Sequence, residues 1–188
     1  MKTVELCPDP IHGQVDLRSE ALSHDAGARL IRAGLLTAVI DGLFSSVLAQ
    51  FFYGSTVARL FQGVASVPLG ADAMNGGTRT AAIGIGIHVC VAFAWSAIFL
   101  FVFMRLAWIR RTLEDPYGVF KIAALYGPLV WVTMSFVLVP LFPPHRFPQN
   151  WTRWWIQFIG HAAFVGLPIV ASISGRFSSA KTARVSMA

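Results

Sequence analysis

Apolar residues are concentrated in four long segments that are separated by shorter, more polar stretches. The segments cover residues 33–53, 81–104, 122–142 and 154–174. A helix needs about 20 apolar residues to cross the hydrocarbon layer, so each segment is long enough. The runs are continuously apolar and do not alternate with a period of two, which favours helices over the strands of a barrel. The pattern predicts an all-α polytopic membrane protein, a bundle of four transmembrane helices.

The three connections between these segments differ in character. The first connection is long, moderately apolar and bounded by glycines, and we expect a short extra helix at 57–66, ended by Pro68 and Gly70. This helix is too short to span, so it lies on the outer surface or dips back between the others. The second connection contains RRTLEDPYG and is predicted to be a basic, turn-forming loop; the third contains PLFPPHRFPQN and is predicted to be an extended cap. We divide the chain into a partly disordered tail at 1–29, a transmembrane domain at 30–175 and a second tail at 176–188.

Composition supports a membrane protein. The chain is 55% hydrophobic and only 13% charged, whereas a soluble domain is about 25% charged. The net charge of +6 is interpreted as a topology signal and not as a nucleic-acid interface. The composition predicts the lipid bilayer as a partner. Association with other membrane subunits, or with further copies of the chain as a homo-oligomer, is possible as well.

Lysine and arginine are unevenly distributed between the connections. Most of them lie in the two tails and in the second connection, while the first connection has only Arg59 and Arg79 and the third only Arg146 and Arg153. The positive-inside rule therefore predicts that both termini are cytoplasmic.

Polar residues within the predicted spans are the candidate functional residues: Asp41, Tyr126, His88, Gln157 and His161. An uncompensated charge at mid-bilayer costs at least ~2.5–3.5 kcal/mol, so these side chains should face the interior of the bundle. Small residues recur every four positions around His88 and form a stripe of Gly84, His88, Ala92 and Ser96. A second stripe is formed by Ala82, Gly86, Cys90 and Ala94. Such stripes allow close helix contacts, so this helix is predicted to touch protein on two sides.

Motifs of common enzymes are absent. The chain has no nucleotide-binding glycine loop, no HExxH, no CxxC and no nucleophile elbow. Neither a catalytic residue nor a metal site is therefore predicted, and no cofactor is expected.

Several stretches resemble a group of small, uncharacterised bacterial four-helix membrane proteins. They are AVIDGLF, ARLFQGVASVPLG, NGGTRTAAIGIGIHV, ALYGPLVWVTMSFVLVPL and HAAFVGLPIVAS. The resemblance implies the four-helix fold and a bacterial cytoplasmic (inner) membrane location. It also implies that six polar residues are important, namely Asp41, Arg59, Gln62, His88, Tyr126 and His161. Ser135 departs from the pattern, in which an asparagine is expected. The resemblance implies no activity.

Three hypotheses follow for function. The first is a non-enzymatic membrane protein whose Asp/His interior serves permeation, proton-coupled transport or a subunit role in a larger assembly, because histidine titrates near neutrality. The second is a redox protein in which His88 and His161 hold a b-type haem or contact a quinone. The third, an enzyme acting on lipid, ranks last because no nucleophile is evident. A purely structural role, with each histidine bonded to a neighbouring helix, is the alternative to all three.

Overall fold

The computed structural model describes residues 10–142 and 150–175, with side chains from residue 25 onward. Every regular element in this part of the chain is helical. Most of the third connection and the outer parts of both tails lie outside the described residues, so the predictions made for them stay predictions.

The chain forms four long helices and several short ones. The spans that are long and apolar enough to cross a membrane are Asp25–Phe52, Gly77–Arg105, Gly118–Leu141 and Trp151–Ile173. The first span consists of the part of α1 (Pro10–Val47) from Asp25 onward and the π-helical turn η1 (Leu48–Phe52). The second consists of α3 (Gly77–Phe101) and η3 (Phe103–Arg105), and the third of α5 (Gly118–Thr133), η4 (Met134–Leu138) and η5 (Val139–Leu141). The fourth consists of α6 (Trp151–His161), η6 (Ala162–Gly166) and α7 (Leu167–Ile173). Between the first two spans lie α2 (Val57–Leu69) and η2 (Ala71–Asn75), and α4 (Ala107–Glu114) lies between the second and third. The predicted four-helix fold with an extra helix is confirmed.

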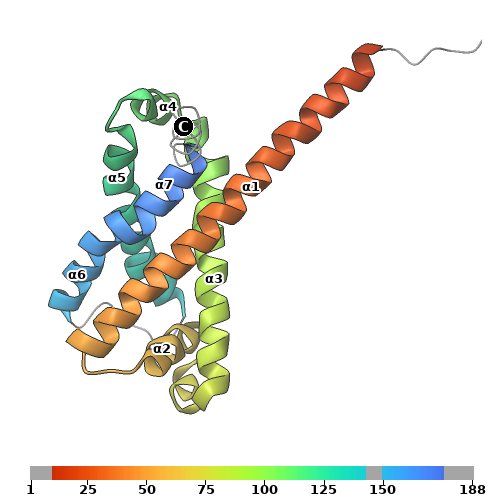
Figure 1. The fold of residues 1–188 in the computed structure, drawn as a ribbon. Coiled ribbons are helices and arrows are strands. Elements are labelled where there is room, and N and C mark those ends of the chain that lie inside the picture. The colour runs from red at the N-terminus through yellow and green to blue at the C-terminus, as the bar shows by residue number, and fades with distance from the viewer. Residues whose placement is uncertain (1–9, 143–149, 176–188) are drawn as a thin grey trace, which may run out of the picture.

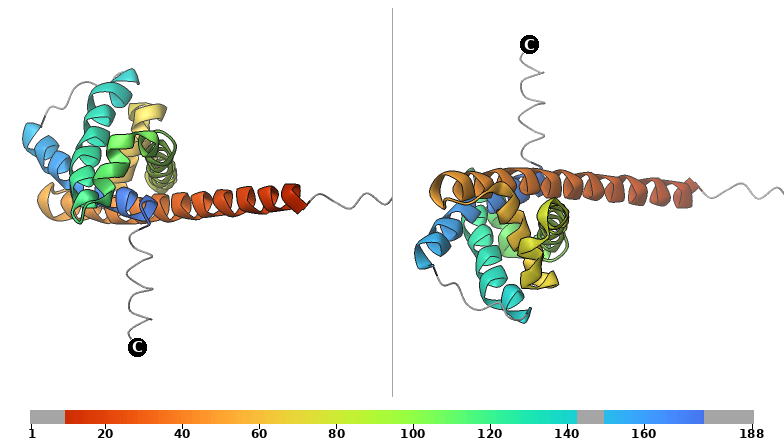
Figure 2. Two further views of the ribbon diagram at one scale, coloured as in Figure 1. Left: turned by 90° about the horizontal axis from the view of Figure 1, so that it is seen from above. Right: turned by 90° about the horizontal axis from the view of Figure 1, so that it is seen from below.

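The helices cross as a bundle whose two ends differ (Figure 1). The end of α7 and the short helix α4 lie at one end, which we call the α4 end, whereas α2 and the start of α6 lie at the other, the α2 end. Helix α1 packs against α3 on one side and α7 on the other. Its N-terminal part projects away from the bundle (Figure 2).

Three local expectations differ from the structure. Helix α1 already begins at Pro10, because hydropathy locates the apolar span and not the end of the helix that contains it. Helix α2 continues past Pro68 to Leu69, where Gly70 ends it with a φ of 87° and an N–H bond of 2.9 Å to the Ser66 carbonyl. The predicted basic loop is largely helix α4, which buries Ile109 and Leu113.

Close helix contacts form on only one of the two small-residue stripes of α3. A methyl group at Gly84 would overlap the backbone of Phe61, so α2 lies directly on α3 at this point. The second stripe is exposed along its length, and nothing in the described residues lies within contact distance of a methyl group added at Gly86. The close helix contact expected at the second stripe is therefore not formed within the described residues, and α3 meets α1 and α2 through its other faces.

The α4 end of the bundle is filled by a dense apolar core. Phe99, Ile169 and Ile173 are fully buried there, and the ring of Tyr126 packs edge-on against Phe99 at 4.8 Å. Toward the α2 end, π-helical turns interrupt two of the spanning helices, η4 before Pro140 and η6 before Pro168. A proline offers no N–H to the preceding turn and clashes with it, which accounts for the widened turns at both places.

Candidate functional site

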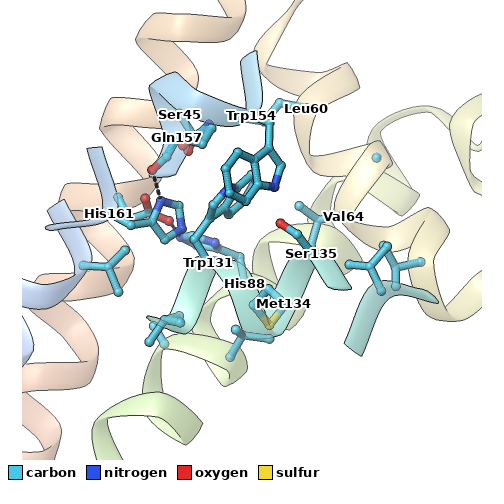
Figure 3. A pocket seen from close by; sticks show the side chains of 18 of the residues that line it. Ser45, Leu60, Val64, His88, Trp131, Met134, Ser135, Trp154, Gln157 and His161 are labelled. Atoms are coloured by element: carbon cyan, nitrogen blue, oxygen red, sulfur yellow. Dashed lines mark hydrogen bonds and ion pairs between the residues drawn. The ribbon is translucent and has the colours of Figure 1, made fainter. Parts of the chain in front are cut away.

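A cavity of about 600 Å³ opens between the helices toward the α2 end. Its walls come from α1, α2, α3, α5 with η4, and α6 (Figure 3). One end is bounded by Tyr53, Asn150 and Arg153, at the edge of the bundle, and the other by Thr37 and Trp95, in the middle of their helices. We call the first end the mouth and the second the floor. The cavity therefore reaches roughly half-way along the spanning helices.

Asp41 and His88 meet at the floor of the cavity. Asp41 lies on α1, is 9% exposed, and has Oδ2 3.9 Å from Nε2 of His88 on α3. That separation is an ion-pair distance and too long for a hydrogen bond. The same Nε2 lies 3.1 Å from the Ala38 carbonyl oxygen. Because a carbonyl can only accept, Nε2 carries the proton and donates it, which leaves Nδ1 of a neutral ring as an acceptor.

His161 reaches the same floor from the C-terminal end of α6. Its Nδ1 donates to the Gln157 carbonyl at 2.8 Å, and its ring lies 4.7 Å from that of Trp131 (Figure 3). Gly127 of α5 makes this position possible, because a methyl group there would overlap the His161 backbone. The hydrogen bond fixes the ring so that Nε2 of the neutral imidazole is the acceptor.

Buried polar atoms without a hydrogen-bond partner gather around this cavity. Within the described residues they are Thr37 Oγ1, Asp41 Oδ1, Tyr53 Oη, Trp131 Nε1, Trp154 Nε1, Gln157 Oε1 and Ser172 Oγ. All of them except Ser172 Oγ belong to residues that line the cavity. An unsatisfied buried group costs about 1–3 kcal/mol, so this concentration is typical of a site whose polar groups serve a bound molecule and not the fold.

Aromatic and aliphatic side chains form most of the wall. Trp95 bounds the floor, and Trp131 and Trp154 also line the cavity, beside valines of α2, α3 and η5. At the mouth, the guanidinium carbon of Arg153 lies 4.3 Å from the centre of the Tyr53 ring, and Nη2 donates to the Tyr53 carbonyl at 3.5 Å. Arg153 is thus held against Tyr53, on the opposite end of the cavity from Asp41.

The residues predicted from the sequence divide into two groups. Asp41, His88, Gln157 and His161 line the one cavity, as does Ser135, the departure from the family pattern. Three others do not line it, and they are Arg59, Gln62 and Tyr126.

Each of these three has another place in the fold. Tyr126 is 2% exposed and donates its hydroxyl proton to the Trp95 carbonyl at 2.7 Å, within the core of the α4 end. Gln62 ties α2 to the start of α3 through a 2.9 Å bond from Nε2 to the Gly77 carbonyl. Arg59 is exposed on α2. The expectation that Tyr126 shares the polar interior is therefore corrected: its hydroxyl belongs to the apolar core.

Several lining residues were not among the predicted site residues. Thr37 and Ser45 lie one turn before and one turn after Asp41, a period of four that already indicated a common face. Trp95 and Trp131 lie inside spanning helices and not at their ends, where tryptophan usually anchors a membrane protein. That unusual depth was the available signal. Nothing in the local sequence marked Arg153.

Comparison of the chain with protein-family models, with curated proteins and with solved structures found no match. The resemblance to a bacterial four-helix group consequently stays a prediction, and the function has to be argued from the site itself. Among the described residues, no group of three or more His, Cys, Asp or Glu side chains is arranged to hold a metal ion. What the arrangement can do chemically is bind a small organic molecule and exchange a proton at the floor.

Proposed function

We propose that this chain is a proton-coupled transporter of small organic molecules in the bacterial cytoplasmic membrane, with the cavity as its binding site. Both termini are cytoplasmic in this proposal, so the cavity opens on the opposite side of the membrane. It rests on the positive-inside rule for orientation and on the resemblance for the bacterial membrane.

One observation carries the proposal: the cavity runs from the α2 end to the floor beside Asp41, where Thr37 and Trp95 bound it. Beyond the floor, the core around Phe99 and Ile169 fills the bundle. A site that is open to one side and closed to the other is what alternating access requires of one of its two states. A carboxylate buried within a membrane span is, by default, part of an ion or proton path.

The groups that face Asp41 support a role in proton exchange. His88 approaches it from α3 and His161 from α6, and each ring has one nitrogen free to accept a proton. The uncharged Thr37 and Ser45 flank it on α1, while the cation Arg153 stands at the mouth. One carboxylate and two imidazoles, each able to bind a proton, therefore lie together at the floor.

Uptake into liposomes tests the proposal. The purified protein is reconstituted, and uptake of labelled 3-phenylpropylammonium, 3-phenylpropanol and 3-phenylpropionate is followed with and without an imposed pH gradient. At least one compound should enter faster than into protein-free liposomes, and only with the gradient. The double substitution Asp41→Asn with His88→Ala should reduce this uptake to background, because it removes the proton-binding pair.

The matched control is Asp72→Asn, which changes an exposed carboxylate on η2 in the same way. This variant should transport like the unmodified protein. Gradient-dependent uptake that survives the double substitution, or its absence for all three compounds, would rule out the proposed transport.

A second candidate function is redox chemistry with a b-type haem or a quinone. It is favoured by the two histidines at one floor and by the anchored Nδ1 of His161, the arrangement usual for a metal-binding imidazole. His88 fits less well, because its Nε2 donates to the Ala38 carbonyl. An absorption spectrum of the purified protein decides the haem version, since a preparation without a Soret band eliminates it.

A further inference from the structure

The unpartnered atoms of the cavity differ in kind between its floor and its walls. Toward the floor, Oδ1 of ionised Asp41 and Oε1 of Gln157 can only accept a hydrogen bond, and the Thr37 hydroxyl can do so as well. The walls contribute the indole N–H groups of Trp131 and Trp154, which can only donate. A molecule that satisfies the floor must therefore bring hydrogen-bond donors to its inner end.

The charged side chains of the cavity narrow the class of ligand further. Asp41 is the carboxylate of the cavity lining, and Arg153, the arginine of that lining, stands at the mouth against Tyr53. In their neutral form the two histidine rings give no hydrogen bond to Asp41 Oδ1, because His88 directs its proton to the Ala38 carbonyl and His161 directs its own to the Gln157 carbonyl. The floor is therefore complementary to a positively charged donor.

The wall favours the same class of molecule. Aromatic faces attract an organic cation through the quadrupole of the ring, most strongly for tryptophan. Trp95, Trp131 and Trp154 line the cavity, and valine side chains fill much of the remaining wall. A cavity of about 600 Å³ is within the usual range for a drug-sized ligand.

We propose that the cavity binds a small organic ammonium ion with at least one N–H group and an apolar body, its charged end at Asp41. This inference rests on the proposed function and names its substrate class. The ammonium donates to Asp41 Oδ1 and Gln157 Oε1, and the apolar body lies between the tryptophans. A proton and the ammonium compete for the same carboxylate, which couples the two.

Binding to the protein in lipid nanodiscs tests the substrate class. Calorimetric titration uses 3-phenylpropylammonium, the uncharged 3-phenylpropanol and the anionic 3-phenylpropionate, each corrected for partition into nanodiscs without protein. The ammonium should bind at least about tenfold more tightly than either analogue, because the alcohol offers an uncharged donor in place of a charged one and the carboxylate offers no donor at all. Lowering the pH should weaken ammonium binding, since a proton then occupies Asp41.

Substitution locates the effect. Asp41→Asn should remove about tenfold or more of the affinity for the ammonium and reduce that for the alcohol much less, because an amide oxygen still accepts from a hydroxyl. Asp72→Asn, the exposed carboxylate used as a control, should bind all three compounds like the unmodified protein. The comparison of the three compounds on the unmodified protein decides the matter even if Asp41→Asn does not fold.

The outcomes separate this inference from the proposed function. Equal or tighter binding of the alcohol or the carboxylate overturns the ammonium class and leaves a small-molecule cavity in place. Failure of all three compounds to bind a folded protein overturns both the class and the proposed transport. Equal loss of alcohol and ammonium affinity in Asp41→Asn overturns the contact with Asp41.

Discussion

Asp41 and Tyr126 are both polar residues within membrane-spanning helices, but their surroundings differ. The Tyr126 hydroxyl donates a hydrogen bond to the Trp95 carbonyl at 2.7 Å, and the Tyr126 ring packs against Phe99 and Phe103. Asp41 has one oxygen without a partner in the described residues and the other 3.9 Å from His88. A satisfied buried group stabilises the fold, whereas an unsatisfied one costs stability and is typical of a functional site.

This contrast predicts the effect of removing the Tyr126 hydroxyl. Tyr126→Phe should lower the free energy of unfolding by about 0.5–1.5 kcal/mol, the net value of one hydrogen bond. Ligand binding should not change, because Tyr126 does not line the cavity. Unfolding with increasing SDS in mixed micelles measures the first quantity and calorimetric titration the second.

Tyr117→Phe is the matched control, since Tyr117 is 71% exposed. It should leave both quantities unchanged. Loss of binding in Tyr126→Phe at unchanged stability would contradict the structural role and return Tyr126 to the site, where the sequence had placed it.

At the scale of the elements, the position of α2 depends on a small residue of α3. It lies against α3 where Gly84 has no side chain, and it supplies Leu60 and Val64 to the cavity wall. The adjacent Gln62 also binds the start of α3, through the Gly77 carbonyl. Any side chain at Gly84 would therefore push α2 outward and change the cavity.

A pair of glycine substitutions on α3 tests this arrangement. Gly84→Ala should lower the free energy of unfolding by about 1–3 kcal/mol, because the added methyl group overlaps the Phe61 backbone. Gly86→Ala, half a turn away with no neighbour for its methyl group among the described residues, should leave stability unchanged or slightly raised. SDS unfolding measures both. Equal stability of the two variants would show that α2 does not rest on Gly84.

The sequence predicted the spanning helices because continuous apolar runs and a fixed bilayer thickness determine them directly. It predicted α4 as a loop because Ile109 and Leu113 are separated by charged and polar residues, and their burial depends on the ends of neighbouring helices. The polar side chains of the floor could be predicted because charge in a membrane must face inward. The residues that form the cavity walls could not be predicted, because the way the helices cross decides which face of Trp95 or Trp154 borders the cavity.

At the scale of the whole molecule, one half of the bundle is packed and the other is hollow, and this difference can be tested with single cysteines. In a chain with Cys7→Ser and Cys90→Ala, Ser135→Cys places a thiol in the cavity wall, and Ser172→Cys places one at a fully buried position of α7 outside it. A small, membrane-impermeant thiol reagent is applied to right-side-out and inside-out membrane vesicles. Ser135→Cys should react from outside in right-side-out vesicles, and Ser172→Cys should react in neither.

The two possible deviations have different meanings, because orientation and closure are independent properties of the bundle. Reaction of Ser135→Cys only in inside-out vesicles would reverse the orientation expected from the positive-inside rule and leave the one-ended cavity intact. Reaction of Ser172→Cys from the α4 end would show that the packed half opens without a ligand, so the core around Phe99 would not be the closed gate that alternating access needs. With both results as expected, the floor at Asp41 is the point that a transported molecule must pass, and opening the α4 end becomes the conformational change to be sought.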